Sequence, residues 1–353
     1  MRYLGLDVHS KATVWCLLDE HGEGLERGKT PTTEAGLSSL VGRLGANDEL
    51  LAGQEIGTMS YFVHDVLTAA GTKLLSFNAQ HLRVIAASRK KTDKRDAYWI
   101  AKTLQTGMTP HPVYIPSGQV RRLRQLLSQR ETLKRERMRW LLRAQTRARA
   151  AGAKASRCSS VTAILTKLLS DPDGVDEHLA EELERCQRMH EVLSVELQQL
   201  EATIRQLARG IEPIKRLQTI PAVGLWVAVT IYAWVGDVSR FASARKLASY
   251  AGLVPSVWQS AESQRSGGIT KEGSSSLRRI LTQAGHVLLW CCNSHAAAPL
   301  KAIAMRVHTS RRRRKIAVVA AARHILRIAY YVLRDGTSYD PARLKAPEPD
   351  TAT

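Results

Sequence analysis

The chain has 353 residues, of which 44% are hydrophobic, and its 52 basic and 32 acidic side chains give a formal net charge of +20. Length and hydrophobic content predict two or three domains with buried cores, while the charge argues against an ordinary metabolic enzyme and favours a polyanionic partner such as nucleic acid. We find neither a run of about 18 apolar residues nor a CxxC pair, which excludes a membrane span and argues against a zinc ribbon.

The first part of the chain predicts an α/β domain, which we bound at residues 1–110. Strand patterning alternates with helix signals in a βββαβαβ order, which is typical of a mixed sheet with helices packed on it. A further helix ends before Gly107 and Pro110. The expected strands are 2–8, 12–19, a short one after Gly24, 49–54 and 73–77, and the expected helices are 35–45, 59–70 and 94–106.

Long helices are expected over residues 111–210. Residues 118–150 contain no proline or glycine after Gly118, which predicts one long basic helix. From Leu179 to Leu207, apolar residues alternate at spacings of four and three, which is typical of a coiled-coil seam. The seam can pair with the 118–150 helix of the same chain or with a second subunit, and we expect some pairing between subunits.

Residues 211–345 predict a mainly α domain. Helices are expected at 225–234, 241–251, 274–297 and 311–334, and the Ser/Gly-rich residues 255–273 predict a long loop. The tail, residues 346–353, is expected to be disordered.

The positive charge is concentrated in three segments. Residues 83–104 carry a net +5, and residues 117–150 and 301–327 carry +9 each, so the rest of the chain is slightly acidic. Solvated helix faces usually interleave acids with bases, and we therefore interpret these segments as nucleic-acid contacts. The residues we expect to bind nucleic acid are Lys90, Lys91, Lys94, Arg95, Arg121, Arg122, Arg124, Lys271, Arg278, Arg311, Arg312, Arg313 and Arg314.

Four acidic residues form a candidate metal site. Asp7 lies in the first predicted strand and Glu55 ends a later one, while Asp93 and Asp96 are three residues apart at the start of a helix. Each of them alone could be a strand-end or helix-capping residue. Together they could meet at one sheet edge and bind Mg²⁺ or Mn²⁺ for phosphoryl transfer, as in a ribonuclease H-like site.

Several motifs resemble one family over nearly the whole chain, from about residue 2 to 341. LGLDVH at the start, GQEIGT around Glu55 and KTDKRDA at 91–97 resemble the N-terminal DEDD domain, a RuvC-like fold, of the IS110/IS1111 family of insertion-sequence transposases. YAGLVPS at 250–256 and GGITKEGSSSLRRIL at 267–281 resemble the C-terminal transposase domain of that family.

The resemblance implies a site-specific DNA recombinase that acts on donor and target DNA. It implies a DEDD metal centre and a serine that attacks DNA to form a covalent phosphoserine link. It also implies a structured guide RNA encoded by the element, of the bridge type, and places the protein in the prokaryotic cytoplasm. Because the two catalytic parts lie far apart in the sequence, we expect a homo-oligomer, a dimer or a tetramer, with a site shared between domains or subunits.

The resemblance also favours Ser260 as the nucleophile. The family pattern spaces a proline, the serine and the isoleucine of GGITK as Pro255, Ser260 and Ile269 are spaced here. Ala261 departs from the glycine that the family has after its serine, so Ser263 and Ser266 stay open as alternatives. Without the resemblance, these serines would be ordinary loop composition.

Two other functions compete with this interpretation. A RuvC-like endonuclease could use the same metal site to hydrolyse branched DNA without a covalent intermediate. A nucleic-acid-binding protein with a degenerate ribonuclease H-like core is disfavoured, because all four candidate carboxylates are present.

Overall fold

The chain divides into two compact units, Met1–Pro116 (unit 1) and Ser117–Thr353 (unit 2). The structure, a computed structural model, describes residues 1–45, 49–80, 82, 93–116, 118–152, 160, 162–163, 166, 177–260, 263–311 and 313–343. In unit 2 the long helices share a hydrophobic core with the C-terminal helices. The predicted domain boundary between residues 210 and 211 stays a prediction.

Unit 1 is built on a five-stranded mixed sheet in the order β3-β2-β1-β4-β5. β2 lies antiparallel to both β1 and β3, whereas β4 lies parallel to both β1 and β5. This is the mixed α/β sheet that the sequence predicts. The strands are β1 (Arg2–Val8), β2 (Ala12–Leu18), β3 (Gly24–Pro31), β4 (Leu50–Glu55) and β5 (Lys73–Phe77).

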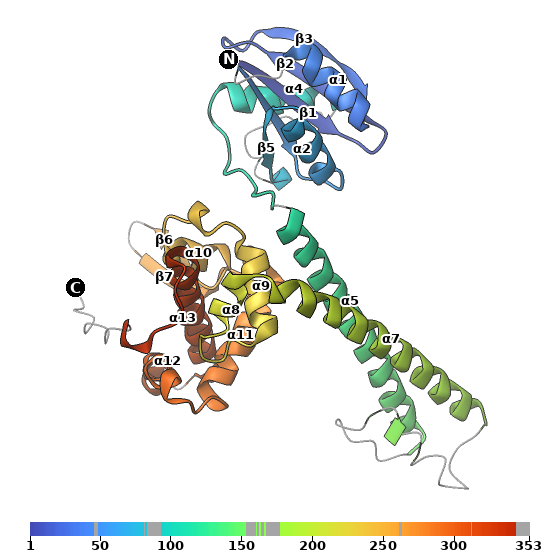
Figure 1. Cartoon of the computed structure of the whole chain (residues 1–353), viewed down its shortest axis with the longest axis vertical. Helices are drawn as coiled ribbons and strands as arrows, with labels where there is room; N and C mark the ends of the chain where they lie inside the picture. The colour runs from blue at the N-terminus through green and yellow to red at the C-terminus, as the bar shows by residue number, and fades with distance from the viewer. Residues whose placement is uncertain are drawn as a thin grey trace. The chain divides into compact units, whose positions relative to one another are not determined.

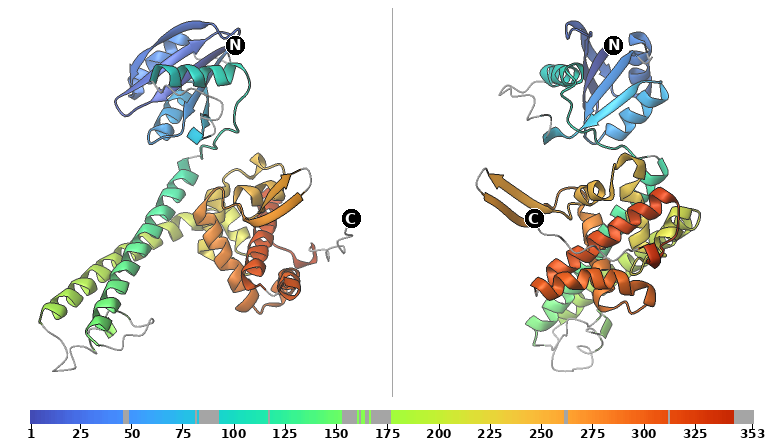
Figure 2. Two further views of the ribbon diagram at one scale, coloured as in Figure 1. Left: turned by 180° about the vertical axis from the view of Figure 1, so that it is seen from behind. Right: turned by 90° about the vertical axis from the view of Figure 1, so that its left-hand side faces the viewer.

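Helices cover both faces of this sheet. Figure 2 shows α1 (Glu34–Leu44) and α2 (Ser60–Ala69) on one face and α4 (Asp93–Gln105) on the other. Alternation along β1 explains the split, because Leu4 and Leu6 are fully buried in the core under α1 and α2.

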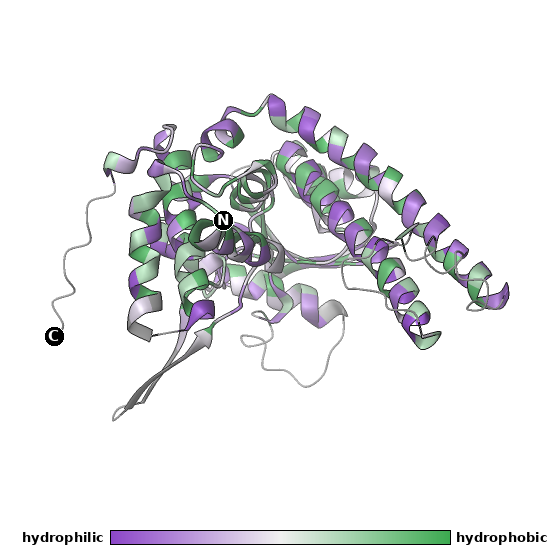
Figure 3. Ribbon diagram, turned by 90° about the horizontal axis from the view of Figure 1, so that it is seen from below, coloured by the Kyte–Doolittle hydropathy of each residue, from purple (hydrophilic) through white to green (hydrophobic). Residues whose placement is uncertain are grey.

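The long helices α5 (Gly118–Ala150) and α7 (Glu177–Arg209) lie side by side as an arm of unit 2 (Figure 1). Seam residues Leu183 and Cys186 are buried against Ala144 and Ala148 of α5, and hydrophobic and hydrophilic residues alternate along both helices (Figure 3). The seam therefore pairs within the chain. A supercoiled coiled coil, and pairing between subunits, stay predictions.

The remaining helices of unit 2 pack around α13, which contributes ten buried residues. By length and composition α13 could cross a membrane, but 56% of its apolar window is buried inside the unit, as expected for a core helix. The helices are α8 (Glu212–Leu217), α9 (Leu225–Val235), α10 (Ala244–Tyr250), α11 (Ser275–Trp290), α12 (Ala298–Arg311) and α13 (Arg314–Asp335).

The predicted Ser/Gly-rich loop is wrong over most of its length. Two antiparallel strands, β6 (Pro255–Ser260) and β7 (Ser263–Ile269), form a hairpin that projects from the helices of unit 2 (Figure 2). The strand sequences PSVWQS and SQRSGGI lack the regular hydrophobic alternation that identifies a strand in a sequence.

Candidate active site and nucleic-acid contacts

Asp7 and Glu55 lie at the same edge of the unit 1 sheet. In the parallel pair formed by β1 and β4, Leu6 is opposite Gln54. Asp7 and Glu55 are the next residue of each strand, so the register makes them neighbours at the carboxyl ends of two adjacent strands. This is the edge at which ligand-binding groups collect in parallel sheets.

Both carboxylates belong to the sheet face that α4 covers. Two residues earlier in each strand stand Gly5 and Gly53, and residues two apart point to the same face. A Cβ on Gly5 would overlap the backbone of Ala97 in α4, and a Cβ on Gly53 would crowd side chains of the same helix. Glycine at these two positions lets α4 lie directly on the strands.

The direction of α4 brings its first turn to that edge. At the other end of the helix, the side chain of Gln105 donates a hydrogen bond of 3.0 Å to the carbonyl oxygen of Glu20. Glu20 follows β2 and lies beside the start of β1, where its carboxylate contacts the amino group of Met1 at 3.3 Å. The helix therefore runs antiparallel to β1. Its first turn, with Asp93 and Asp96, lies towards the carboxyl ends of β1 and β4.

The donor chemistry of this edge suits a hard divalent cation, because carboxylate oxygens are the ligands that Mg²⁺ and Mn²⁺ prefer. The side chains of Asp7, Glu55 and Asp96 are described, and that of Asp93 lies outside the described residues. Among the described side chains, no three His, Cys, Asp or Glu groups come close enough to hold a metal ion. The backbone thus collects the four positions at one edge, while the described carboxylates do not form a closed ligand set.

A further polar side chain contacts Asp7. Nε2 of His9 lies 3.1 Å from Oδ2 of Asp7, and the Asp7 side chain is 18% exposed. The carboxylate therefore remains accessible from solvent although it projects from a central strand.

The turn that follows Glu55 is fixed by buried polar residues. Gln54 is fully buried, and its Nε2 donates to the carbonyl of Ser60 and to Oγ of Ser76, both at 3.0 Å. The Ser60 hydroxyl accepts a 2.6 Å hydrogen bond from the Gly57 N–H and donates to the Glu55 carbonyl at 3.3 Å. Sequence reasoning missed this support, although a glutamine inside the apolar strand LLAGQE is a visible signal.

In unit 2, the candidate nucleophile Ser260 is the last residue of β6. It pairs with Ser263 of β7 across the end of the hairpin, so the backbone places this alternative beside it, while Ser266 is opposite Val257 further along the hairpin. Ala261 and the side chains of Ser260, Ser263 and Ser266 lie outside the described residues.

The hairpin leaves the helices of unit 2 through a backbone clasp. Gly252 (φ +65°) and Gly273 (φ +75°) adopt left-handed conformations that favour glycine. A Cβ on Gly252 would overlap the backbone of Glu272, and a Cβ on Gly273 would overlap the carbonyl of Tyr250. The motif YAGL at 250–253, which precedes β6, and the motif TKEG at 270–273, which follows β7, are therefore in direct backbone contact.

Arg278 closes this clasp. Its Nη1 donates to the carbonyl oxygens of Glu272 at 2.7 Å, Gly273 at 3.1 Å and Ala251 at 3.3 Å. Nη1 thus binds carbonyl groups that the turn leaves without helical partners, and a phosphate contact by the rest of this guanidinium stays a prediction.

Arg124 also binds backbone carbonyl groups. Its Nε donates to the Ala233 carbonyl at 2.7 Å and its Nη2 to the Trp234 carbonyl at 3.1 Å. Its guanidinium also lies 4.9 Å from the centroid of the Trp234 ring. A cation at the C-terminal end of a helix is favourable, so Arg124 joins α5 to the end of α9, and its predicted contact with nucleic acid stays a prediction.

The other predicted nucleic-acid contacts divide by exposure. Arg314 is exposed, and its guanidinium lies 4.6 Å from the centroid of the Trp290 ring. Arg121 is half-buried, while Arg95, Arg122, Lys271 and Arg313 are exposed. Lys90, Lys91 and Arg312, and the side chains of Lys94 and Arg311, lie outside the described residues.

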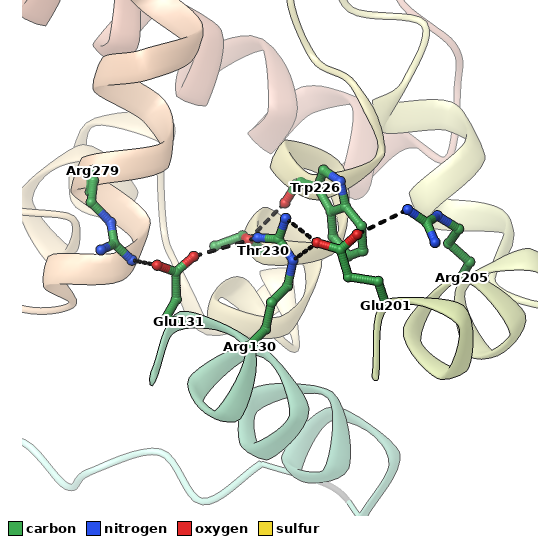
Figure 4. Close-up of polar contacts among 7 residues, drawn as sticks. All are labelled: Arg130, Glu131, Glu201, Arg205, Trp226, Thr230 and Arg279. Carbon is green, nitrogen blue, oxygen red and sulfur yellow. Dashed lines mark hydrogen bonds and ion pairs between the residues drawn. The ribbon is translucent and has the colours of Figure 1, made fainter. Parts of the chain in front are cut away.

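A buried ion-pair cluster connects the two helices of the arm, α5 and α7, to α9 of unit 2 (Figure 4). Arg130 of α5 is 7% exposed, and its guanidinium lies 2.7 Å from Oε1 of Glu201 in α7 and 3.9 Å from the centroid of the Trp226 ring in α9. Arg205 contacts the other carboxylate oxygen of Glu201 at 3.0 Å. Three helices far apart in the sequence are thus joined by one charged group.

A second ion pair extends the cluster to α11. Nη2 of Arg279 lies 2.5 Å from Oε2 of Glu131, the neighbour of Arg130 (Figure 4). The arm is therefore tied to the helix that begins after the clasp. Sequence reasoning missed this tie, because counting net charge in 117–150 does not reveal which basic residues have acidic partners elsewhere.

Two family models match the chain. One, described as "Transposase" with a DEDD domain of the IS110 type, matches residues 4–148, and the other, "Transposase IS116/IS110/IS902 family", matches residues 214–301. Together they cover well over half of the chain. The first includes all four candidate carboxylates, and the second includes the β6–β7 hairpin and the clasp.

The chain is also similar to individual curated proteins. It is 26% identical over 185 residues to a probable family 20 transposase of Pseudomonas aeruginosa, which is 52% of this chain and 54% of that protein. It is 36% identical over 89 residues to the transposase for insertion sequence element IS1111A of Coxiella burnetii, 25% of this chain and 24% of that protein. A putative transposase of Sinorhizobium fredii is 30% identical over 191 residues, 53% of this chain and 48% of that protein. The chain thus spans about half or less of the length of these relatives.

Proposed function

The chain belongs to the IS110 family of transposases, and from that premise we propose that it is a DNA recombinase that moves an insertion sequence. Its proposed substrates are donor and target DNA, cut and rejoined through a covalent phosphoserine link at Ser260. The observation that carries the proposal is the register of β1 and β4, which makes Asp7 and Glu55 neighbours under the first turn of α4. The strand order is consistent with a ribonuclease H-like, RuvC-like domain.

In this proposal Asp7, Glu55, Asp93 and Asp96 hold Mg²⁺ or Mn²⁺. The cation, when bound, would stabilise negative charge on the scissile phosphate. The four carboxylates orient the cation, and the polar support beneath Glu55 holds the turn after β4 in place. The carboxylates have to move together to ligate an ion, since the described ones are not within ligating distance of a common point.

Ser260 has the role of nucleophile. Its hydroxyl oxygen forms a bond to phosphorus, the bond to a deoxyribose oxygen breaks, and that oxygen leaves with a proton while the serine proton is lost. A position at the end of a projecting hairpin suits a group that must reach a phosphate on a rigid duplex. We further propose that a homo-oligomer and an element-encoded guide RNA take part, as the family membership suggests.

The test is adduct formation by the full chain. Purified protein, Mg²⁺, labelled element-junction DNA and the transcribed RNA of the element end are combined, and the products are separated on a denaturing gel. A protein-linked DNA band is expected. Ser260→Ala, Asp7→Asn and EDTA should each abolish it, and Mn²⁺ added to the EDTA-treated wild type should restore it. Two matched controls should leave the band in place: Asp65→Asn, at an exposed position of α2, and Ser256→Ala in β6.

The alternative outcome identifies a different enzyme. Cleaved DNA without an adduct, unaffected by Ser260→Ala but lost in Asp7→Asn, would indicate a hydrolytic RuvC-like endonuclease. An adduct that persists in Ser260→Ala but disappears in Ser263→Ala or Ser266→Ala would move the nucleophile along the hairpin. Activity recovered by mixing inactive Ser260→Ala and Asp7→Asn proteins would support a site shared between subunits.

A further inference from the structure

A cavity of about 490 Å³ lies in unit 2 along one face of α13. One wall is a helical stripe with spacings of three and four residues, and the other comes from the segment 337–343 that follows the helix and from Ile303 of α12. The volume lies in the range of about 300–1,000 Å³ that is usual for small-molecule and cofactor sites. The stripe consists of His324, Arg327, Ile328, Tyr331, Val332 and Asp335.

One end of the cavity carries uncompensated positive charge. Arg327 is exposed, and among the described residues it has no ion-pair partner. Arg323 lies one helical turn before it, and burial together with the charge of Arg327 lowers the pKa of Arg323. Burial, then Arg327 and Arg323, lowers the pKa of His324 to about 4, so that it is neutral at physiological pH. An anion would relieve this repulsion.

The middle of the cavity offers an aromatic surface. Tyr331 is 41% exposed although it lies in a core helix. The Tyr330 ring meets it edge-on, at 5.3 Å between centroids and 81° between planes, and the guanidinium of Arg334 lies 4.8 Å from its centroid. These neighbours hold the ring, so it can accept a flat partner with little loss of side-chain entropy.

The other end offers hydrogen-bond acceptors. Asp335 pairs with Arg334 at 2.6 Å, and Asp340 lies 3.7 Å from Arg343. Arg334 binds both oxygens of Asp335, and Oδ1 of Asp340 accepts a hydrogen bond from the Ala342 N–H. A carboxylate oxygen can accept a second hydrogen bond, here from an amine or an amide N–H, and the Ser338 hydroxyl can donate or accept. A ligand for this cavity therefore needs one anionic end, a planar body and an edge with mixed donors and acceptors.

We propose that this cavity binds one unstacked nucleotide of a single-stranded nucleic acid, with the base against Tyr331 and its phosphate at Arg327. A nucleotide has each of the three required features, and single strands are bound by stacking bases on aromatic rings within a positively charged surface. The cavity is lined by none of the four candidate carboxylates and by no residue of the β6–β7 hairpin. The inference therefore does not depend on the proposed chemistry, and its test needs neither cleavage nor a metal ion.

The first experiment measures binding of a short labelled oligothymidylate to the full chain in EDTA by fluorescence anisotropy. Tyr331→Ala should weaken binding roughly tenfold, which is the usual loss for one stacked base, and Tyr331→Phe should restore it. Arg327→Gln should reduce the slope of log affinity against log salt by about 0.7, the value for one phosphate contact on a single strand. Tyr98→Ala and Arg188→Gln, matched in exposure and charge, should change neither quantity.

A second experiment uses the wild-type chain, so that it does not depend on the folding of a variant. An oligonucleotide containing 5-iododeoxyuridine is crosslinked by light, and the modified peptide is identified by mass spectrometry. The crosslink should fall on the α13 peptide that contains Tyr331.

Three results would overturn the proposal. The first is unchanged affinity in a Tyr331→Ala variant that melts like the wild type. The second is a crosslink confined to other peptides. The third is Tyr331-dependent binding of free thymidine monophosphate with no such dependence for the oligonucleotide, which would make the cavity a site for a free nucleotide.

Discussion

Arg130 of α5 lies over the indole ring of Trp226 in α9, with its guanidinium carbon 3.9 Å from the ring centroid, while the same group contacts Glu201 of α7 at 2.7 Å. Its burial makes both contacts strong, because little water screens the charges. A cation that is paired on one side and stacked on the other holds three helices at a fixed spacing.

Replacing Arg130 with methionine should therefore destabilise unit 2. Glu201 would lose its buried partner but keep Arg205, so we expect a loss of about 2–3 kcal/mol, below the roughly 3–5 kcal/mol seen when a buried charge is left alone. Urea unfolding followed by helical circular dichroism measures this. The matched control is Arg188→Met, which removes an exposed pair with Glu184 and should cost less than about 0.5 kcal/mol. Equal effects of the two variants would contradict a special role for the cluster.

Gly5→Ala should loosen α4 from the sheet of unit 1. The new Cβ would overlap the backbone of Ala97, so the helix has to shift, at a cost of about 2–4 kcal/mol. Hydrogen exchange of the α4 peptides should accelerate, and because the first turn carries Asp93 and Asp96, adduct formation should fall as well. Gly24→Ala in β3, where no atom lies within 4 Å of the added Cβ, should leave both measurements unchanged.

Ala222→Gly should maintain or raise stability, in contrast to most alanine-to-glycine changes. Ala222 lies between α8 and α9 with φ +65°, a left-handed conformation that costs a non-glycine residue about 1–2 kcal/mol. Glycine removes this strain but loses about 0.4–1 kcal/mol to the entropy of the unfolded chain, so we expect a net gain of up to about 1 kcal/mol. Ala202→Gly on the exposed face of α7 should instead cost about 1 kcal/mol. A thermal melt of each variant distinguishes the two signs.

The stability of unit 2 should fall as the pH drops from about 6.5 to about 4. Burial, then the charges of Arg327 and Arg323, lowers the pKa of His324 to about 4 in the folded protein, against about 6.5 for an ordinary histidine. In that range the unfolded chain therefore binds a proton that the folded chain does not, and the stabilisation present above pH 6.5 is lost, by up to about 2–3 kcal/mol. Unfolding titrations of His324→Gln should show a flatter profile over this window than those of the wild type. His178→Gln, on exposed α7, should retain the wild-type slope.

Much of unit 1 follows from the sequence, because β1, β2, β4 and β5 contain buried apolar residues and α1 has a clear start. Thr33 caps α1 by accepting a hydrogen bond from the Gly36 N–H, as a threonine before a helix predicts. The convergence of Asp7 and Glu55 could be anticipated from the order of the strands, but their side-by-side register could not, since it depends on how β1 and β4 pair.

Unit 2 was harder to predict because its features depend on partners distant in the sequence. The heptad seam of α7 indicates that a partner helix exists, but not whether it belongs to the same chain. Similarly, Arg124 and Arg278 have the same side chain as a phosphate-binding arginine, and only the fold shows that backbone carbonyl groups of α9 and of the clasp lie within their reach.

The clasp beneath the hairpin also bears on how this protein can change over evolution. Gly252 and Gly273 hold the base of the hairpin through backbone atoms, with Arg278 bound to their neighbours' carbonyl groups. The contacts that hold this base are made by backbone atoms and by the Arg278 side chain. Substitutions along the two strands can therefore alter what the hairpin touches while its anchored base is retained.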